Sequence, residues 1–183
     1  MSDVKASIPK EKQTVLGLYL TAKQAWERCQ AEPEKVKLID VRTPEELLFV
    51  GHPTVVWKIP AFAQVYEWDA EKGKFPMKYL DDFVARVKTV ASPDDTLLVM
   101  CRSGGRSALA VNLLAQAGFT HVHNVVDGME GDPVDDPGSA AHGKRLKNGW
   151  KNSGCPWTCK LTPERLLLPG AAGEIAPACG CRA

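Results

Sequence analysis

The chain has 183 residues, of which 44% are hydrophobic and 25% are charged, and its formal net charge is +1. This composition is typical of one globular domain with a short appendage. The small net charge argues against nucleic acid or an anionic membrane surface as a partner, and no apolar run is long enough to span a bilayer. The N-terminus lacks the apolar core of a signal peptide, so we expect a cytoplasmic protein.

The first third of the chain predicts an arm, a strand and a helix. Residues 1–13 are polar and predict a flexible N-terminal arm. A short first strand is expected within 16–20. Thr21 and Gln24 then match a capping box, which marks the start of a helix. The buried face of that helix follows the spacing i, i+3, i+4 and i+7 and comprises Ala22, Ala25, Trp26 and Cys29.

Strands and helices then alternate along the chain. Further strands are predicted over 36–41, 55–59, 96–100 and 122–126. A helix is expected to start at Thr43 and Pro44, with Glu46 at its third position, and others are expected over 80–87 and 108–117. This order predicts an α/β domain over 14–132, with a central, mostly parallel five-stranded sheet flanked by helices. Residues 133–183 lack a long periodic segment and predict an irregular C-terminal extension that packs on the domain or trails it.

A thiol lies in the turn between the strand over 96–100 and the next helix, where open α/β sheets place their sites. The turn has the sequence Cys101, Arg102, Ser103, Gly104, Gly105, Arg106 and Ser107. A helix starting near Ser107 would direct its free N–H groups and positive dipole end at the thiol. The glycines let backbone amides converge on one point, and the two arginines suit an oxyanion.

The turn therefore favours a thiolate beside a small anion. It contains no general base, which suits a cysteine held as thiolate by its surroundings rather than a serine nucleophile. The alternative is a structural cysteine beside a glycine turn, because free cysteine is often buried. Under that alternative, Arg102 and Arg106 would also need to be buried or paired.

This turn resembles the active-site loop of the single-domain rhodanese (thiosulfate sulfurtransferase) family, in which a cysteine opens a six-residue loop at the end of the central strand. Here that loop is 101–106. The other resembling segments are 38–46 with its Asp-x-Arg, Gly51-His52-Pro53, the glycine-rich turn 126–132, and the tail motifs 149–151 and 154–157. The resemblance covers about residues 18–157 in the expected order, which makes it stronger than one motif.

The resemblance implies a rhodanese-like fold and a sulfurtransferase. Cys101 would take sulfane sulfur from thiosulfate or a similar anionic donor, become a persulfide, and pass the sulfur to cyanide, a thiol or an acceptor protein. Residues 102–107 would bind the donor and stabilise the persulfide, with Arg102 and Arg106 as the anion-binding charges. Asp40 and Arg42 match the family's paired residues and are expected to support the loop.

Other functions compete with this interpretation. A persulfide sulfur carrier uses the same cysteine, whereas a non-catalytic interaction module is expected to lack it. Cysteine phosphatases resemble Cys-x5-Arg, but only four residues separate Cys101 from Arg106. The shorter loop has fewer amides to surround a phosphate, which disfavours that chemistry. No cofactor or metal is expected at the site, since no other Cys or His lies near Cys101 in the sequence.

The sequence says less about two departures from the family pattern and about the roles of the remaining cysteines. Pro53 and Asp127 replace an aliphatic residue and a glycine of the family, and both are expected at the pocket rim. Cys29 is expected in the core. The tail thiols Cys155, Cys159, Cys179 and Cys181 could bind zinc, relay sulfur, or be unrelated surface cysteines, and their spacings are not those of a zinc knuckle.

Overall fold

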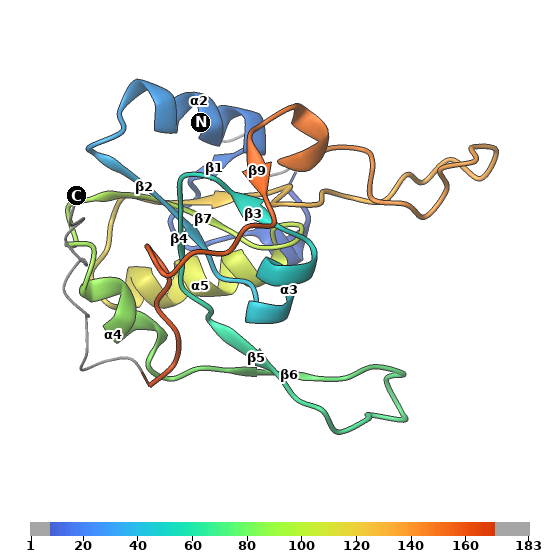
Figure 1. Ribbon diagram of the computed structural model, residues 1–183, viewed down its shortest axis with the longest axis horizontal. Coiled ribbons are helices and arrows are strands. Elements are labelled where there is room, and N and C mark those ends of the chain that lie inside the picture. The colour runs from blue at the N-terminus through green and yellow to red at the C-terminus, as the bar shows by residue number, and fades with distance from the viewer. Residues whose placement is uncertain (1–7, 171–183) are drawn as a thin grey trace, which may run out of the picture.

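The computed structural model describes residues 8–170. Its main sheet has five strands in the order β1-β8-β7-β2-β4 (Figure 1). Every strand pair in this sheet is parallel. The bounds of the strands are β1 Tyr19–Leu20, β2 Val36–Asp40, β4 Val56–Lys58, β7 Thr96–Met100 and β8 Val122–Val125. The predicted α/β class with a five-stranded parallel sheet is confirmed.

Four α-helices connect these strands: α2 Ala22–Ala31, α3 Pro44–Phe49, α4 Phe83–Lys88 and α5 Gly105–Gln116. Thr21 and Thr43 each accept a hydrogen bond from the backbone three residues on, and both predicted capping boxes are present. α5 begins at Gly105, slightly earlier than the helix start near Ser107 that the sequence suggests. The loop between β7 and α5 is correspondingly shorter.

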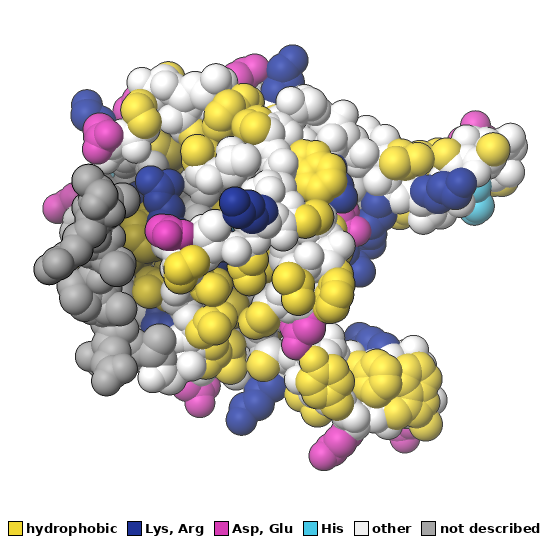
Figure 2. Space-filling model, viewed as in Figure 1, with side chains coloured by type: hydrophobic (Ala, Val, Ile, Leu, Met, Phe, Trp, Pro, Cys, Tyr) yellow, Lys and Arg dark blue, Asp and Glu magenta, His cyan; other side chains and the backbone are white. Residues whose placement is uncertain are grey.

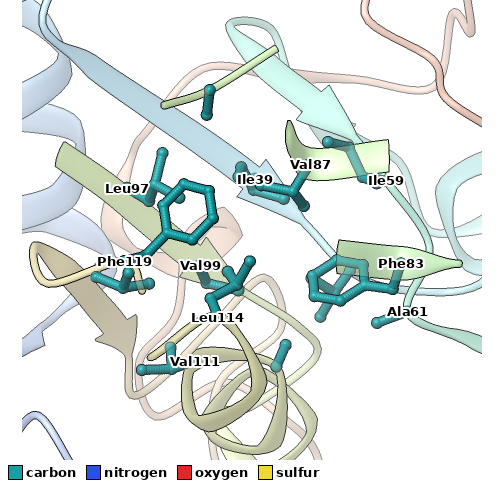
Figure 3. Close-up of a cluster of buried hydrophobic side chains, with 14 of the residues drawn as sticks. Ile39, Ile59, Ala61, Phe83, Val87, Leu97, Val99, Val111, Leu114 and Phe119 are labelled. Atoms are coloured by element: carbon teal, nitrogen blue, oxygen red, sulfur yellow. The ribbon is translucent and has the colours of Figure 1, made fainter. Parts of the chain in front are cut away.

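The two faces of the sheet bury different elements. Alternate side chains of β2 and β7, such as Ile39 and Val99, pack with α4 and α5 on one face (Figure 3). Their neighbours Leu38 and Leu98 pack with α2 on the other face, which also buries Trp150 of the C-terminal extension. This alternation follows from the period of two along a strand, and it places β7 in the middle of the fold.

The C-terminal extension packs on the domain from Trp150 to Leu167, whereas the loop before Trp150 projects away from it (Figure 1). Trp150 is fully buried, stacks edge-on against Trp26 and donates its indole N–H to the carbonyl of Pro156. Further along, Leu166 forms a parallel bridge with Lys58, which pairs backbone groups on the free edge of β4. The 3₁₀ turn η2 Lys151–Ser153 leads to β9 Trp157–Thr158, which pairs with β3 His52–Pro53. The extension thus covers one sheet edge and part of one face.

A projecting hairpin has no counterpart among the sequence predictions. Its strands β5 Phe62–Gln64 and β6 Met77–Tyr79 pair antiparallel and extend away from the sheet (Figure 1). The loop between them exposes aromatic side chains, including Trp68, which meets Phe75 at 5.2 Å between ring centroids. Figure 2 shows apolar side chains gathered on this hairpin. Strands of three residues are too short to give a periodic signal.

The N-terminal segment differs from the flexible arm expected over 1–13 in its described part. Lys10–Lys12 form a 3₁₀ turn (η1) that packs on α5. Lys12 is buried, and its ammonium donates to Asp132 at 2.7 Å. The end of the arm is therefore tied to the turn that follows β8.

Asp127, which departs from the family pattern, is buried between two segments of the chain. Its carboxylate accepts hydrogen bonds from the N–H of Ala22 at 2.7 Å and of Gly149 at 3.0 Å. It thereby joins the N-terminus of α2 to the extension. Burial raises the pKa of this carboxyl, although the two backbone donors oppose that shift.

Among residues 8–170, no helix has the length and apolar character needed to cross a bilayer.

Replacing Trp150 with alanine is expected to lower the free energy of unfolding by about 3–5 kcal/mol, because it empties a fully buried aromatic site. Urea denaturation measures this loss. Trp68→Ala is the matched control, since that indole is 59% exposed and should change stability by less than about 1 kcal/mol. A loss of stability in Trp150→Ala no larger than that in Trp68→Ala would contradict a stabilising role for the buried indole.

Candidate active site

Cys101 lies directly after β7 and is almost completely buried, with 1% of its surface exposed. Its Sγ accepts a hydrogen bond from the N–H of Gly104 at 3.2 Å. The loop therefore bends back on its first residue and places the sulfur in front of the N-terminus of α5. A positive helix end and an N–H donor both favour negative sulfur over the neutral thiol.

Two glycines allow this tight path. Gly104 has a φ of 97°, and a Cβ there would collide with the carbonyl of Val126. Gly128 has a φ of 57°, and a Cβ there would collide with the carbonyl of Cys101. Both positions need the left-handed backbone region and close approach of two chain segments, which only glycine combines without strain. The loop is thus built against the turn after β8.

That turn fixes the loop through backbone hydrogen bonds. The N–H of Met129 donates to the carbonyl of Cys101 at 2.8 Å, and the N–H of Glu130 donates to that of Arg102 at 2.9 Å. The loop N–H groups themselves remain available. Within residues 8–170, the backbone amides of 102, 103, 105 and 106 donate to no other group. Such unpaired amides at a helix start form a concave donor set for an anion.

The guanidinium of Arg106 is paired with Glu46 of α3, a contact that sequence reasoning missed. Its two terminal nitrogens each donate to one carboxylate oxygen at 2.6 Å, and the side chains are 18% and 17% exposed. Burial alone would raise the pKa of Glu46, but the hydrogen bonds and charge of Arg106 outweigh it and lower that pKa. The sequence indicated Glu46 only as part of the capping box of α3, and that local role gave no sign of the ion pair with Arg106.

Arg102 is the loop arginine that stays unengaged. Its side chain is exposed, and in the described chain it makes no hydrogen bond or ion pair. Arg145, by contrast, donates to the carbonyl of Gly131 in the turn after β8. The free positive charge at this edge of the sheet is therefore that of Arg102 rather than of Arg106.

Asp40 and Arg42 form a buried pair at the end of β2. Nε and one terminal nitrogen of Arg42 donate to the carboxylate, the shortest contact being 2.7 Å, and both side chains are fully buried. The same terminal nitrogen donates to the carbonyl of Gly51. Burial opposes the charge on Arg42, but Asp40 outweighs it and raises the pKa of Arg42. Their side-chain hydrogen bonds go to each other and to Gly51, and Asp40 pairs in register with Met100, the residue before Cys101.

Charges of alternating sign connect this pair to the sulfur. Arg42 is stabilised by Asp40 and also by Glu46, which in turn binds Arg106. The pKa of Arg106 is raised against the effect of burial, chiefly by Glu46 and with a contribution from Cys101. The charges of Asp40, Arg42, Glu46 and Arg106 therefore alternate in sign, and Arg106 is the member of this series that interacts with Cys101.

Ser107 and Asn124 lie beneath the sulfur. Ser107 Oγ is 3.4 Å from Cys101 Sγ and 2.6 Å from Asn124 Oδ1. Ser107 was predicted as part of the loop, whereas Asn124 was regarded only as a residue of the strand over 122–126. The available signal was an asparagine between the apolar residues of a buried strand, two positions after Val122 and directly before Val125. Both side chains are fully buried, so their hydrogen bonds must be satisfied internally.

The other described cysteines differ from Cys101 in their surroundings. Cys29 packs against the core on α2, as predicted, and burial raises its pKa to about 11. Cys155 is buried in the same cluster with a raised pKa, and Cys159 is exposed. Residues 8–170 contain no group of three or more His, Cys, Asp or Glu side chains arranged for a metal. Cys179 and Cys181 lie outside the described residues.

Replacing Glu46 with glutamine is expected to lower the free energy of unfolding at neutral pH by about 2–4 kcal/mol, because it breaks a largely buried ion pair. The folded-state pKa of Glu46 lies below its unfolded value. The pair's contribution is therefore complete above the unfolded value of about 4.3 and is lost as the pH falls through the folded pKa. Urea denaturation at neutral and at acid pH measures the difference between the two proteins.

Glu45→Gln is the control, since Glu45 is adjacent but bonds only to the exposed Tyr66 hydroxyl and to local groups. Its effect should stay within about 0.5 kcal/mol. A loss in Glu46→Gln that does not shrink at low pH would contradict the ionic origin of the stabilisation.

Sequence and structure comparisons agree with this geometry. The chain is 31% identical over 120 residues to an uncharacterized protein of Rickettsia prowazekii, RP600, covering 66% of this chain and 80% of that protein. It is 35% identical over 92 residues to thiosulfate sulfurtransferase 16, chloroplastic, of Arabidopsis thaliana, covering 50% of this chain and 69% of that protein. The crystal structure of Rv0390 from M. tuberculosis aligns with a TM-score of 0.56 and 32% identity, over 77% of this chain and 96% of that one.

A more distant structure shares the fold. The polysulfide-sulfur transferase homodimer of Wolinella succinogenes aligns with a TM-score of 0.51 at 24% identity, over 85% of this chain and 86% of that one. The Rhodanese-like domain family matches residues 21–131, a range that contains the loop, the Asp40–Arg42 pair and Asn124. With the parallel sheet and the cysteine loop at its carboxyl edge, this match shows that the chain belongs to the rhodanese-like family.

Proposed function

We propose that the protein is a sulfurtransferase that moves sulfane sulfur from thiosulfate, or a similar anionic donor, to a thiophilic acceptor through a persulfide on Cys101. The observation that carries this proposal is the position of Cys101 Sγ, which accepts the Gly104 N–H inside a loop of otherwise unpaired amides. Such a site stabilises a sulfur anion and a small oxyanion together. Family membership and the Arabidopsis thiosulfate sulfurtransferase add support.

The reaction has two displacement steps. The thiolate of Cys101 attacks the outer sulfur of thiosulfate, forming an S–S bond, and sulfite leaves with the electron pair of the broken bond. The acceptor, cyanide or a thiolate, then attacks the outer sulfur of the persulfide. Thiocyanate or a new persulfide departs, and the Cys101 thiolate is regenerated, so the kinetics should be ping-pong.

The two arginines take different parts in this scheme. Arg106 cannot reach a donor without releasing Glu46, so it acts through its field on the sulfur and by holding the start of α5. Arg102 is exposed and unpaired, and it binds the sulfonate oxygens of the donor. We propose this division in place of the sequence-based expectation that both arginines bind the anion.

Paired Arg106 also weighs against phosphatase chemistry, in which the loop arginine must clasp a phosphate. The persulfide-carrier alternative uses the same first step and differs in the acceptor, which would be a partner protein. A reducing compartment, such as the cytoplasm, suits the free thiol that either reaction needs. The described cysteines are all free thiols, consistent with that setting.

Incubation with thiosulfate is expected to add one sulfur atom to Cys101, detectable by intact mass and by peptide mapping. Thiosulfate and cyanide together should then yield thiocyanate and sulfite. Cys101→Ser is expected to abolish both the mass gain and the turnover, because serine cannot form the persulfide. Cys159→Ser is the matched control, since that thiol is exposed and should leave both results unchanged.

A persulfide on Cys101 without thiocyanate formation would favour the carrier function. Absence of both would contradict a sulfur-transfer role altogether.

Replacing Arg102 with methionine is expected to reduce kcat/KM for thiosulfate by about ten- to a hundredfold, mainly through KM, because one charged hydrogen bond to the donor is lost. Steady-state thiocyanate formation at fixed cyanide measures this change. Lys88→Met on α4 is the control for removing an exposed positive charge away from the loop. A change in Arg102→Met no larger than in the control would remove Arg102 from donor binding.

A further inference from the structure

The side-chain amide of Asn124 has a fixed orientation. Its nitrogen donates to the carbonyl of Lys12 at 2.9 Å and to that of Gly104 at 3.0 Å. Both partners are pure acceptors, so the two hydrogens of the amide must point at them. The amide oxygen therefore faces Ser107, and the opposite assignment would set oxygen against oxygen twice.

This orientation decides where the Ser107 proton lies. Ser107 Oγ is 2.6 Å from Asn124 Oδ1, a distance that requires a hydrogen between the two oxygens. A hydroxyl has one hydrogen, and the amide oxygen has none to give. Ser107 must therefore donate to Asn124, which leaves only its lone pairs directed at the sulfur 3.4 Å away.

We propose that Asn124 is a positioning residue that makes the Ser107 hydroxyl an acceptor toward Cys101, and thereby favours the protonated thiol in the sulfur-free enzyme. In the proposed arrangement the S–H of the neutral thiol donates to Ser107 Oγ across the 3.4 Å contact, and the N–H of Gly104 remains the donor to sulfur. The usual expectation for a hydroxyl beside a reactive cysteine is the reverse, a donor that stabilises the thiolate.

The charged groups around the thiol set the opposing tendency. Arg102 and Arg106 lie on its own loop and on α5, Glu46 faces it from α3, and Asp40 and Arg42 lie at the end of β2. Glu130 follows Met129, which donates to the Cys101 carbonyl, and Lys12 lies on η1. None of these charged side chains forms a hydrogen bond with the side chain of Ser107 or Asn124. Variants of Ser107 and Asn124 therefore change the hydrogen bond to the sulfur without removing a charge.

The consequence for the proposed sulfur-transfer function is a difference between the empty and the loaded enzyme. A persulfide leaves no hydrogen on Sγ, so the contact with Ser107 operates only when Cys101 carries no sulfur. The resting cysteine is then partly protected from oxidation, which follows thiolate character. The inference depends on the proposed function for this meaning, but its test does not require sulfur transfer.

The test is the pH dependence of alkylation of Cys101 by iodoacetamide in the full chain, resolved from the other cysteines by peptide mass spectrometry. Ser107→Ala is expected to shift the midpoint of the profile down by about half to one pH unit, because the neutral thiol loses its acceptor. Asn124→Ala should shift it in the same direction, since the freed Ser107 hydroxyl can turn to donate to the thiolate. Ser107→Thr keeps the hydroxyl and should restore the wild-type midpoint.

A double variant and a control complete the design. In a Ser107→Ala background, Asn124→Ala should add no further shift, because Asn124 acts through Ser107. Ser139→Ala, in the loop after the β8 turn, should leave the midpoint unchanged. Circular dichroism of each variant verifies folding, and the sign of the Ser107→Ala shift decides the direction of the bond even if Asn124→Ala is destabilised.

An upward shift in Ser107→Ala would show that the hydroxyl donates to the thiolate and would overturn the proposal, as would no shift. A downward shift there with no change in a folded Asn124→Ala would remove Asn124 from the assignment. Failure of the proposed function is seen separately, as a wild-type Cys101 that gains no sulfur from thiosulfate whatever its alkylation profile.

Discussion

The pairing of Arg106 with Glu46 is the constraint on which the site depends. It joins the first turn of α5, which follows the cysteine loop, to α3, which follows the Asp40–Arg42 pair in the chain. Without a carboxylate beside it, a largely buried guanidinium at that helix start would be unfavourable. With it, the charges alternate from the end of β2 to the thiol, and the sulfur lies next to a positive group that is itself satisfied.

The loop needs support on its other side as well. The carbonyls of Cys101 and Arg102 accept hydrogen bonds from the turn after β8, whereas the amides of 102, 103, 105 and 106 have no acceptor within residues 8–170. The same turn is tied by Lys12 to the N-terminal segment and by Asp127 to α2 and the extension. Segments from both ends of the described chain therefore fix a loop that contributes few contacts of its own, which is how a rigid scaffold positions a reactive group.

Helices and strands were predictable because their signals are local. Thr21 and Thr43 mark helix starts through capping boxes, and the apolar run in 96–100 marks a strand that is buried on both faces. The hairpin of β5 and β6 and the pairing of β3 with β9 were not predicted, since two- and three-residue strands have no periodicity. Burial of Trp150 and Lys12 was also missed, because it depends on which distant segment covers them.

For the site, the sequence by itself determined the proposed nucleophile and its loop: a cysteine between a buried strand and a helix, with glycines and arginines at fixed spacing. These features lie within seven consecutive residues, so local geometry is enough to place them. Only the tertiary structure decided how the arginines divide, with Arg106 bound by Glu46 and Arg102 free, and that Asn124 lies against Ser107 beneath the sulfur. Those contacts join residues 17 to 60 positions apart, and a hydrogen bond across such a separation leaves no periodic trace in the chain.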